Sequence, residues 1–181
     1  NYSDSYEKYY GNNIYDGPDA SHGTHVAGII AATRNNEIGM DGIAANVKIM
    51  TVRVVPDGDE RDKDVANGII YAADNGAKII NMSFGKLYSW DKKAVDKALK
   101  YAQKKGVLMV HAAGNNSADN DKIDHYPVEK FEKKKLCGKK RANNWIEVGA
   151  LNFRQGQDFC APFSNYGTEE VDLFAPGMAI Y

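Results

Sequence analysis

The sequence predicts a three-layer α/β fold in which a mainly parallel sheet carries helices on both faces. Between residues 47 and 150, short apolar segments typical of strands alternate with longer segments whose apolar residues recur at helical spacing. Two of these helical segments are followed by a glycine, where a helix C-cap is expected. Strand, helix and strand at these lengths are typical of a parallel sheet covered by helices. With 181 residues, 43% of them hydrophobic, the chain can form one domain with a sizeable core.

The first predicted helix spans residues 21–32 and follows a polar N-terminal arm, residues 1–20. This helix is apolar on all sides, so we expect it to be central and buried. Ser21 is a suitable N-cap, and Asp19 in front of it is placed to stabilise the helix start. His22 then lies in the first turn, where the helix dipole disfavours the protonated imidazole. A neutral imidazole at this place can act as a general base, although a lone histidine is more often structural.

The remaining elements alternate between strands and helices. The sequence predicts a strand at 47–55, a helix at 62–75 before Gly76, a strand at 78–82, a helix at 91–105 before Gly106, and strands at 107–112 and 145–150. The apolar stripes of the two helices indicate ordinary core packing.

A Lys-rich segment at about 129–141 interrupts this pattern. It carries a local excess of five positive charges, which predicts a solvated surface insertion outside the core. A docking surface for a partner is the alternative interpretation.

The overall charge and hydropathy exclude some classes of partner. The formal net charge is −1, from 23 basic and 24 acidic residues, which gives no general attraction to nucleic acids or anionic membranes. No apolar run approaches the roughly 18 residues of a membrane-spanning helix. We therefore expect no nucleic-acid partner and no membrane span. The two cysteines, Cys137 and Cys160, fit either a disulfide or two free thiols, and we favour free thiols.

Polar residues follow two of the predicted strands, as Asn-Met-Ser-Phe-Gly at 81–85 and Ala-Ala-Gly-Asn-Asn at 112–116. Functional sites in open parallel sheets gather at the carboxyl ends of the strands. Each segment alone fits a polar turn, but the string Ser-His-Gly-Thr-His-Val-Ala-Gly at 21–28 resembles the histidine motif of the subtilisin-like serine proteases. In the same chain order, 81–85 resembles the substrate-binding strand of that family and Asn115 resembles its oxyanion asparagine. Further matches to the family lie at 146–150, 163–167 and 175–177.

The resemblance implies a serine endopeptidase that hydrolyses peptide bonds with an Asp-His-Ser triad. It implies that His22 is the general base and that Asn115 donates a hydrogen bond to the tetrahedral oxyanion. An extended polypeptide substrate would pair with the backbone as an added strand. The implied substrate-binding residues are Ser83, Phe84, Gly85, Ala113 and Gly114.

The triad aspartate and serine of the family have no match in this chain. No aspartate before His22 ends an apolar strand, and no Gly-Thr-Ser-Met-Ala motif follows the Ala-Pro-Gly segment at 175–177. We therefore expect an internal fragment, with a partial peptidase domain over 21–181, that is inactive alone and self-associates through exposed apolar surface. The alternative is a catalytically dead binding module of the same family. A nucleotide-binding domain ranks lower, because no Gly-rich phosphate loop follows a predicted strand.

The resemblance implies that no cofactor is required. Members of the family often bind calcium, but no Asp/Asn-rich loop here indicates a site. A metal site at His22 and His25 is disfavoured because no third His or Cys lies nearby in sequence, so we expect no metal. By resemblance, we expect a secreted, periplasmic or cell-surface protein.

Overall fold

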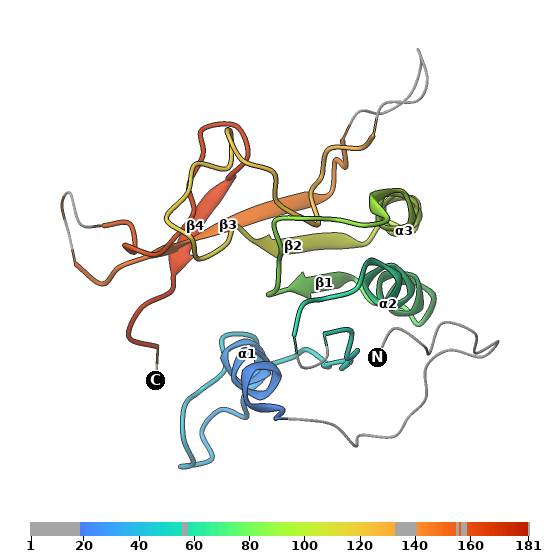
Figure 1. The fold of residues 1–181 in the computed structure, drawn as a ribbon. Helices are drawn as coiled ribbons and strands as arrows, with labels where there is room; N and C mark the ends of the chain where they lie inside the picture. Colours follow the sequence, from blue (N-terminus) through green and yellow to red (C-terminus); the bar gives the residue numbers. More distant parts are fainter. Residues whose placement is uncertain (1–18, 56–57, 133–140, 155, 157–158, 181) are drawn as a thin grey trace.

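We describe the fold from a computed structural model, which places residues 19–55, 58–132, 141–154, 156 and 159–180. The described elements are α1 (Ser21–Ala31), α2 (Asp62–Asp74), β1 (Ile79–Met82), α3 (Lys92–Lys104), β2 (Leu108–Ala112), β3 (Trp145–Leu151) and β4 (Leu173–Pro176) (Figure 1). The four strands form one sheet in the order β1-β2-β3-β4, and each neighbouring pair is parallel. The predicted parallel sheet is therefore confirmed.

Helices α2 and α3 pack against each other on one side of the sheet, as predicted (Figure 1). Each is followed by a glycine in the left-handed region, Gly76 at φ 86° and Gly106 at φ 75°. The carboxylate of Asp62, the first residue of α2, accepts a hydrogen bond from the Asp91 backbone N–H at 2.6 Å. The same carboxylate lies 2.7 Å from the Lys86 ammonium. Asp62 therefore fixes the start of α2 to the loop in front of α3.

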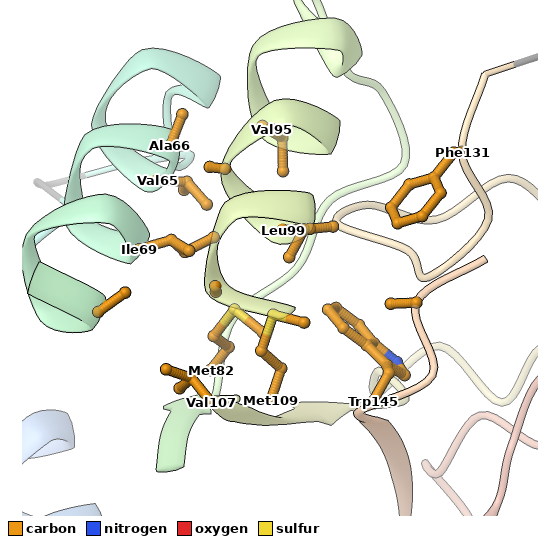
Figure 2. Packing of buried hydrophobic residues seen from close by; sticks show 14 residues of the cluster. Val65, Ala66, Ile69, Met82, Val95, Leu99, Val107, Met109, Phe131 and Trp145 are labelled. Carbon is orange, nitrogen blue, oxygen red and sulfur yellow. The ribbon is translucent and has the colours of Figure 1, made fainter. Parts of the chain in front are cut away.

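The hydrophobic core lies between these two helices and strands β1 to β3 (Figure 2). Leu99 of α3 is fully buried at its centre, above Met82 of β1 and Met109 of β2. Trp145 and Phe131 close one end of the core. In β2 and β3 every second residue is thus buried on this side of the sheet, and the residues between them are half-buried on the other face.

The prediction that the first helix is central and buried is wrong for the described chain. None of the residues of α1 is buried, and the helix lies apart from α2 and α3 (Figure 1). The segment after it does pair with its last turn, because the N–H groups of Ile43 and Ala44 donate to the carbonyls of Ile29 and Ile30. An all-apolar helix is buried only where other elements cover it, and among the described residues only this segment covers α1, at its last turn.

The start of α1 differs by one residue from the prediction, since Ala20 and not Ser21 is the N-cap. Asp19 nevertheless stabilises this helix end. Its carboxylate accepts hydrogen bonds from the Ser21 N–H at 2.8 Å and from the Ser21 hydroxyl at 2.7 Å. These bonds lower the pKa of the Asp19 carboxyl, with the bond from the hydroxyl as the larger cause.

The predicted strand at 47–55 is also wrong, because the structure has no strand over these residues. Strand β1 is the edge of the described sheet, and the segment does not extend the sheet beyond it. It is held by side-chain packing instead. A Cβ added at Gly68 of α2 would lie 2.4 Å from the nearer methyl carbon of Val54, so the segment lies directly on that helix.

The Lys-rich segment is described only at its two ends, since residues 133–140 lie outside the described chain. The prediction that it lies outside the core is wrong at Phe131, which is buried against α3. Glu129 and Arg141 pair at 3.1 Å, and Lys130 and Arg141 both pair with the buried carboxylate of Glu170. The base of this segment is therefore part of the folded structure.

Candidate active site

A cleft lies at the carboxyl ends of the strands, on the face of the sheet opposite α2 and α3. In β2 and β3 the half-buried residues of this face alternate with buried ones, and the buried His111 and Gly149 also border the cleft. Both Ser83, just after β1, and Asn115, just after β2, line this cleft. Its full lining is Asn81, Ser83, Val110, His111, Ala112, Gly114, Asn115, Val148, Gly149, Ala150, Ala175, Pro176 and Gly177.

The structure brings some of the expected site residues together and leaves others apart. Ser83, Gly114 and Asn115 share the cleft. The other expected binding residues lie behind it. Ala113 is buried, and Phe84 sets its ring edge against the His111 ring with centroids 6.4 Å apart. A Cβ added at Gly85 would lie 3.7 Å from the same imidazole.

His22 does not line the cleft in the described chain, and its side chain is exposed. The reason is the position of α1, which carries His22 near its start and lies apart from the α2–α3 layer (Figure 1). The structure thus places the expected oxyanion donor beside part of the expected substrate strand, without the expected base.

Sequence reasoning missed a buried polar cluster that borders the cleft through His111. The imidazole of His111 and the carboxylate of Glu147 are each only 2% exposed, and they face each other across β2 and β3. His111 Nδ1 lies 2.9 Å and 3.0 Å from the two carboxylate oxygens, and the indole N–H of Trp145 donates to Glu147 at 2.8 Å. His125 Nε2 lies 3.9 Å from the same carboxylate.

The signal for this cluster was present in the alternation of β3. Trp145, Glu147 and Gly149 lie on one face of the strand, so a charged residue stands between two buried positions. A buried carboxylate needs hydrogen-bond donors. The neighbouring predicted strand offers a histidine, His111, as one such donor.

The model of the subtilase family, peptidase S8, matches residues 1–180. The chain belongs to the subtilase family. A thermophilic serine proteinase of Bacillus sp. (strain AK1) is 41% identical over 170 residues, which are 93% of this subtilase chain and 37% of that protein. The cell wall-associated protease of Bacillus subtilis (strain 168) is 39% identical over 170 residues, 93% of this chain and 16% of its own length. The chain thus spans well under half of each of these two curated relatives.

The fold agrees with this assignment. The structure of a cold adapted subtilisin-like serine proteinase superposes on 86% of this subtilase chain and 48% of its own, with a TM-score of 0.64 and 33% identity. The predicted fold, an incomplete three-layer subtilisin-like α/β structure, is therefore confirmed.

Two further expectations concern metals and membranes. Among the residues that the structure describes, no group of three or more His, Cys, Asp or Glu side chains is arranged to bind a metal ion. Likewise, no described helix is both long and apolar enough to cross a bilayer. Cys160 is exposed and has no disulfide partner in the described ranges, while Cys137 lies outside them, so the expectation of two free thiols stays a prediction.

One exposed carboxylate organises the loop behind the Asn115 turn. Asp121 accepts hydrogen bonds from the Thr168 hydroxyl and N–H, both at 2.8 Å, and from the N–H groups of Glu169 and Glu170. The bond from the Thr168 hydroxyl is the largest cause that lowers the pKa of Asp121 to about 2.

We expect these contacts to persist in mild acid and to break only near pH 2. A carboxylate whose pKa is lowered by folding stabilises the fold above its ordinary pKa of 3.8, and this stabilisation is lost as the pH falls toward about 2. The chemical shift of the Thr168 amide, followed by NMR against pH, should titrate with a midpoint near 2, and Asp121→Asn should remove the titration. A midpoint near 4 would show that the contacts do not form in solution.

Proposed function

We propose that this chain supplies the general base and the oxyanion donor of a subtilisin-type serine endopeptidase. The observation that carries the proposal is the position of Asn115, on the turn after β2 and in one cleft with Ser83 and Gly114. A neutral carboxamide there can donate a hydrogen bond to the oxyanion of a tetrahedral intermediate without repelling it. The backbone at 83–85 can hold an extended polypeptide substrate as an added strand.

In the proposed mechanism, His22 removes the proton from the hydroxyl of the attacking serine and later gives it to the leaving amine. This needs His22 at the cleft, so α1 has to pack on the open face of the sheet. That face is apolar and suited to a helix that is apolar on all sides. Ile79 and Leu173 are 60% and 44% exposed on it, and Val110, Val148 and Ala150 line the cleft beside them.

We further propose that the triad aspartate and serine come from parts of a longer protein, referred to below as the complete protein. Residues 1–181 alone are then inactive, because no acyl-enzyme can form without the nucleophile. The hydrolysis requires no cofactor, and the described residues give no support for a calcium site. The similarity to a cell wall-associated protease supports a location outside the cell membrane.

A fluorophosphonate probe, which labels activated serines, tests the proposal. The complete protein should be labelled at a serine, and residues 1–181 alone should not be. If residues 1–181 alone were labelled at a serine in a way that depends on His22, the proposal that the triad serine lies elsewhere in the complete protein would be refuted. A complete protein that binds peptides but is never labelled would refute the enzyme and support a binding module.

A further inference from the structure

The turn that carries Asn115 is held by a buried pair of side-chain amides. Asn165 is 1% exposed and Asn120 is 3% exposed, and both lie directly behind residues 113–118. Asn165 comes from the Phe-Ser-Asn-Tyr-Gly segment at 163–167, about fifty residues further along the chain. Buried amides are costly unless their donors and acceptors are paired, so the bonds of this pair show what it does.

Asn165 holds the backbone on both sides of Asn115. Its Oδ1 accepts hydrogen bonds from the N–H of Asn116 at 2.8 Å and from the N–H of Ala118 at 3.1 Å. Its own backbone N–H donates to the carbonyl of Gly114 at 2.9 Å. The residues before and after the proposed oxyanion donor are thus tied to the same asparagine.

Asn120 completes this hydrogen-bond network, and its contacts require a side-chain amide at position 165. Asn165 Nδ2 donates to Asn120 Oδ1 at 3.0 Å, and Asn120 Nδ2 donates to the carbonyl of Ala113 at 2.9 Å. Each amide therefore uses its oxygen as an acceptor and its nitrogen as a donor. An aspartate at 165 would place an acceptor against Asn120 Oδ1 and break the chain of bonds.

The close contact between the turn and Asn165 also explains why residue 114 is a glycine. Its φ of 110° lies in a region that side chains rarely adopt, and an added Cβ would lie 2.6 Å from Asn165 Nδ2. Ser164 fixes Asn165 from the other side. Its hydroxyl donates to the Asn165 carbonyl at 2.8 Å and accepts from the N–H of Ala150 at 2.9 Å, so the pair is anchored to β3.

We propose that Asn165, supported by Asn120, is a positioning residue that presets the Asn115 carboxamide for the oxyanion. This inference rests on the proposed function. Neither amide lines the cleft, so neither touches the substrate. An oxyanion donor is effective because it needs no rearrangement when charge develops, and this requires a turn that does not move. The pair gives the turn that rigidity.

A double-mutant cycle in the complete protein tests this role. Asn165→Asp is expected to lower kcat by about 10- to 100-fold with little change in KM, because a misplaced donor fails mainly in the transition state. In an Asn115→Ala background the same substitution should have almost no effect on kcat, since the group that it positions is gone. The exposed Asn143 gives a matched control, and Asn143→Asp should leave kcat unchanged.

Asn120→Ala is a milder second variant, because it keeps all three hydrogen bonds between Asn165 and the turn. It should show the same kinetic pattern with a smaller loss. Hydrogen exchange gives a readout that does not depend on catalysis: the amides of Asn116 and Ala118 should exchange faster in Asn165→Asp than in the parent protein.

Equal losses of kcat with and without Asn115 would overturn the inference, and so would unchanged exchange at Asn116 and Ala118. Failure of the proposed function looks different. In that case the complete protein would show no hydrolysis that depends on His22, while the exchange of the two amides would still respond to Asn165→Asp.

Discussion

Replacing His22 with alanine in the complete protein is expected to lower kcat by about 10⁶-fold, the size of the loss measured for the triad histidine of a subtilisin. Without the imidazole, the serine hydroxyl keeps its proton and the leaving amine receives none. The remaining activity would come from the oxyanion donor and from substrate binding. Steady-state hydrolysis of a peptide substrate measures the change, and circular dichroism verifies that the variant is folded.

His25 provides a matched control, because it lies on the same helix three residues further on. His25→Ala should retain far more activity than His22→Ala, with any loss explained by stability. Equal losses from the two substitutions would mean that α1 acts as a structural unit and that His22 is not the base.

Replacing Glu147 with alanine should destabilise the complete protein by several kcal/mol, because each buried donor left without an acceptor costs about 1–3 kcal/mol. The substitution leaves the His111 Nδ1 and the Trp145 indole N–H without their acceptor in the core. Chemical denaturation, read as the change in the free energy of unfolding, tests this. Glu147→Gln keeps one acceptor oxygen, so we expect a smaller loss.

The exposed Glu169 serves as the control for this comparison. Glu169→Ala should change stability by less than about 0.5 kcal/mol, as is usual for surface substitutions. If Glu147→Ala proved equally mild, the cluster of His111, Glu147 and Trp145 would have no structural role.

Local patterns in the sequence predicted those elements whose partners are also local. Helices α2 and α3 have one-sided apolar stripes, and they alternate along the chain with strands that are neighbours of one another in the sheet. The segment at 47–55 has the composition of a strand, but composition does not supply a neighbour for hydrogen bonding, and the structure gives it none. The same reason explains why the burial of α1 was predicted wrongly. Its apolar surface indicates that the helix is suited to burial, but the local sequence does not show which element would cover it.

The site shows a similar division. Motif similarity led to Asn115 and Ser83, which the structure places in one cleft. It did not lead to Asn165, whose importance depends on contacts between segments about fifty residues apart. Phe131 was missed because the surrounding lysines dominate its segment, although a single aromatic ring can pack in the core while its neighbours remain in solvent.

The exposure of α1 has a consequence for the survival of unfinished copies. Peptidases cut accessible backbone that opens easily, and a helix that little covers is of this kind. We expect copies in which α1 has not yet packed to be cut near His22 by copies that are already complete. The helix with the proposed base would then act as a checkpoint of assembly. Only molecules in which α1 has packed would then escape digestion, and chains that never reach that state would be removed.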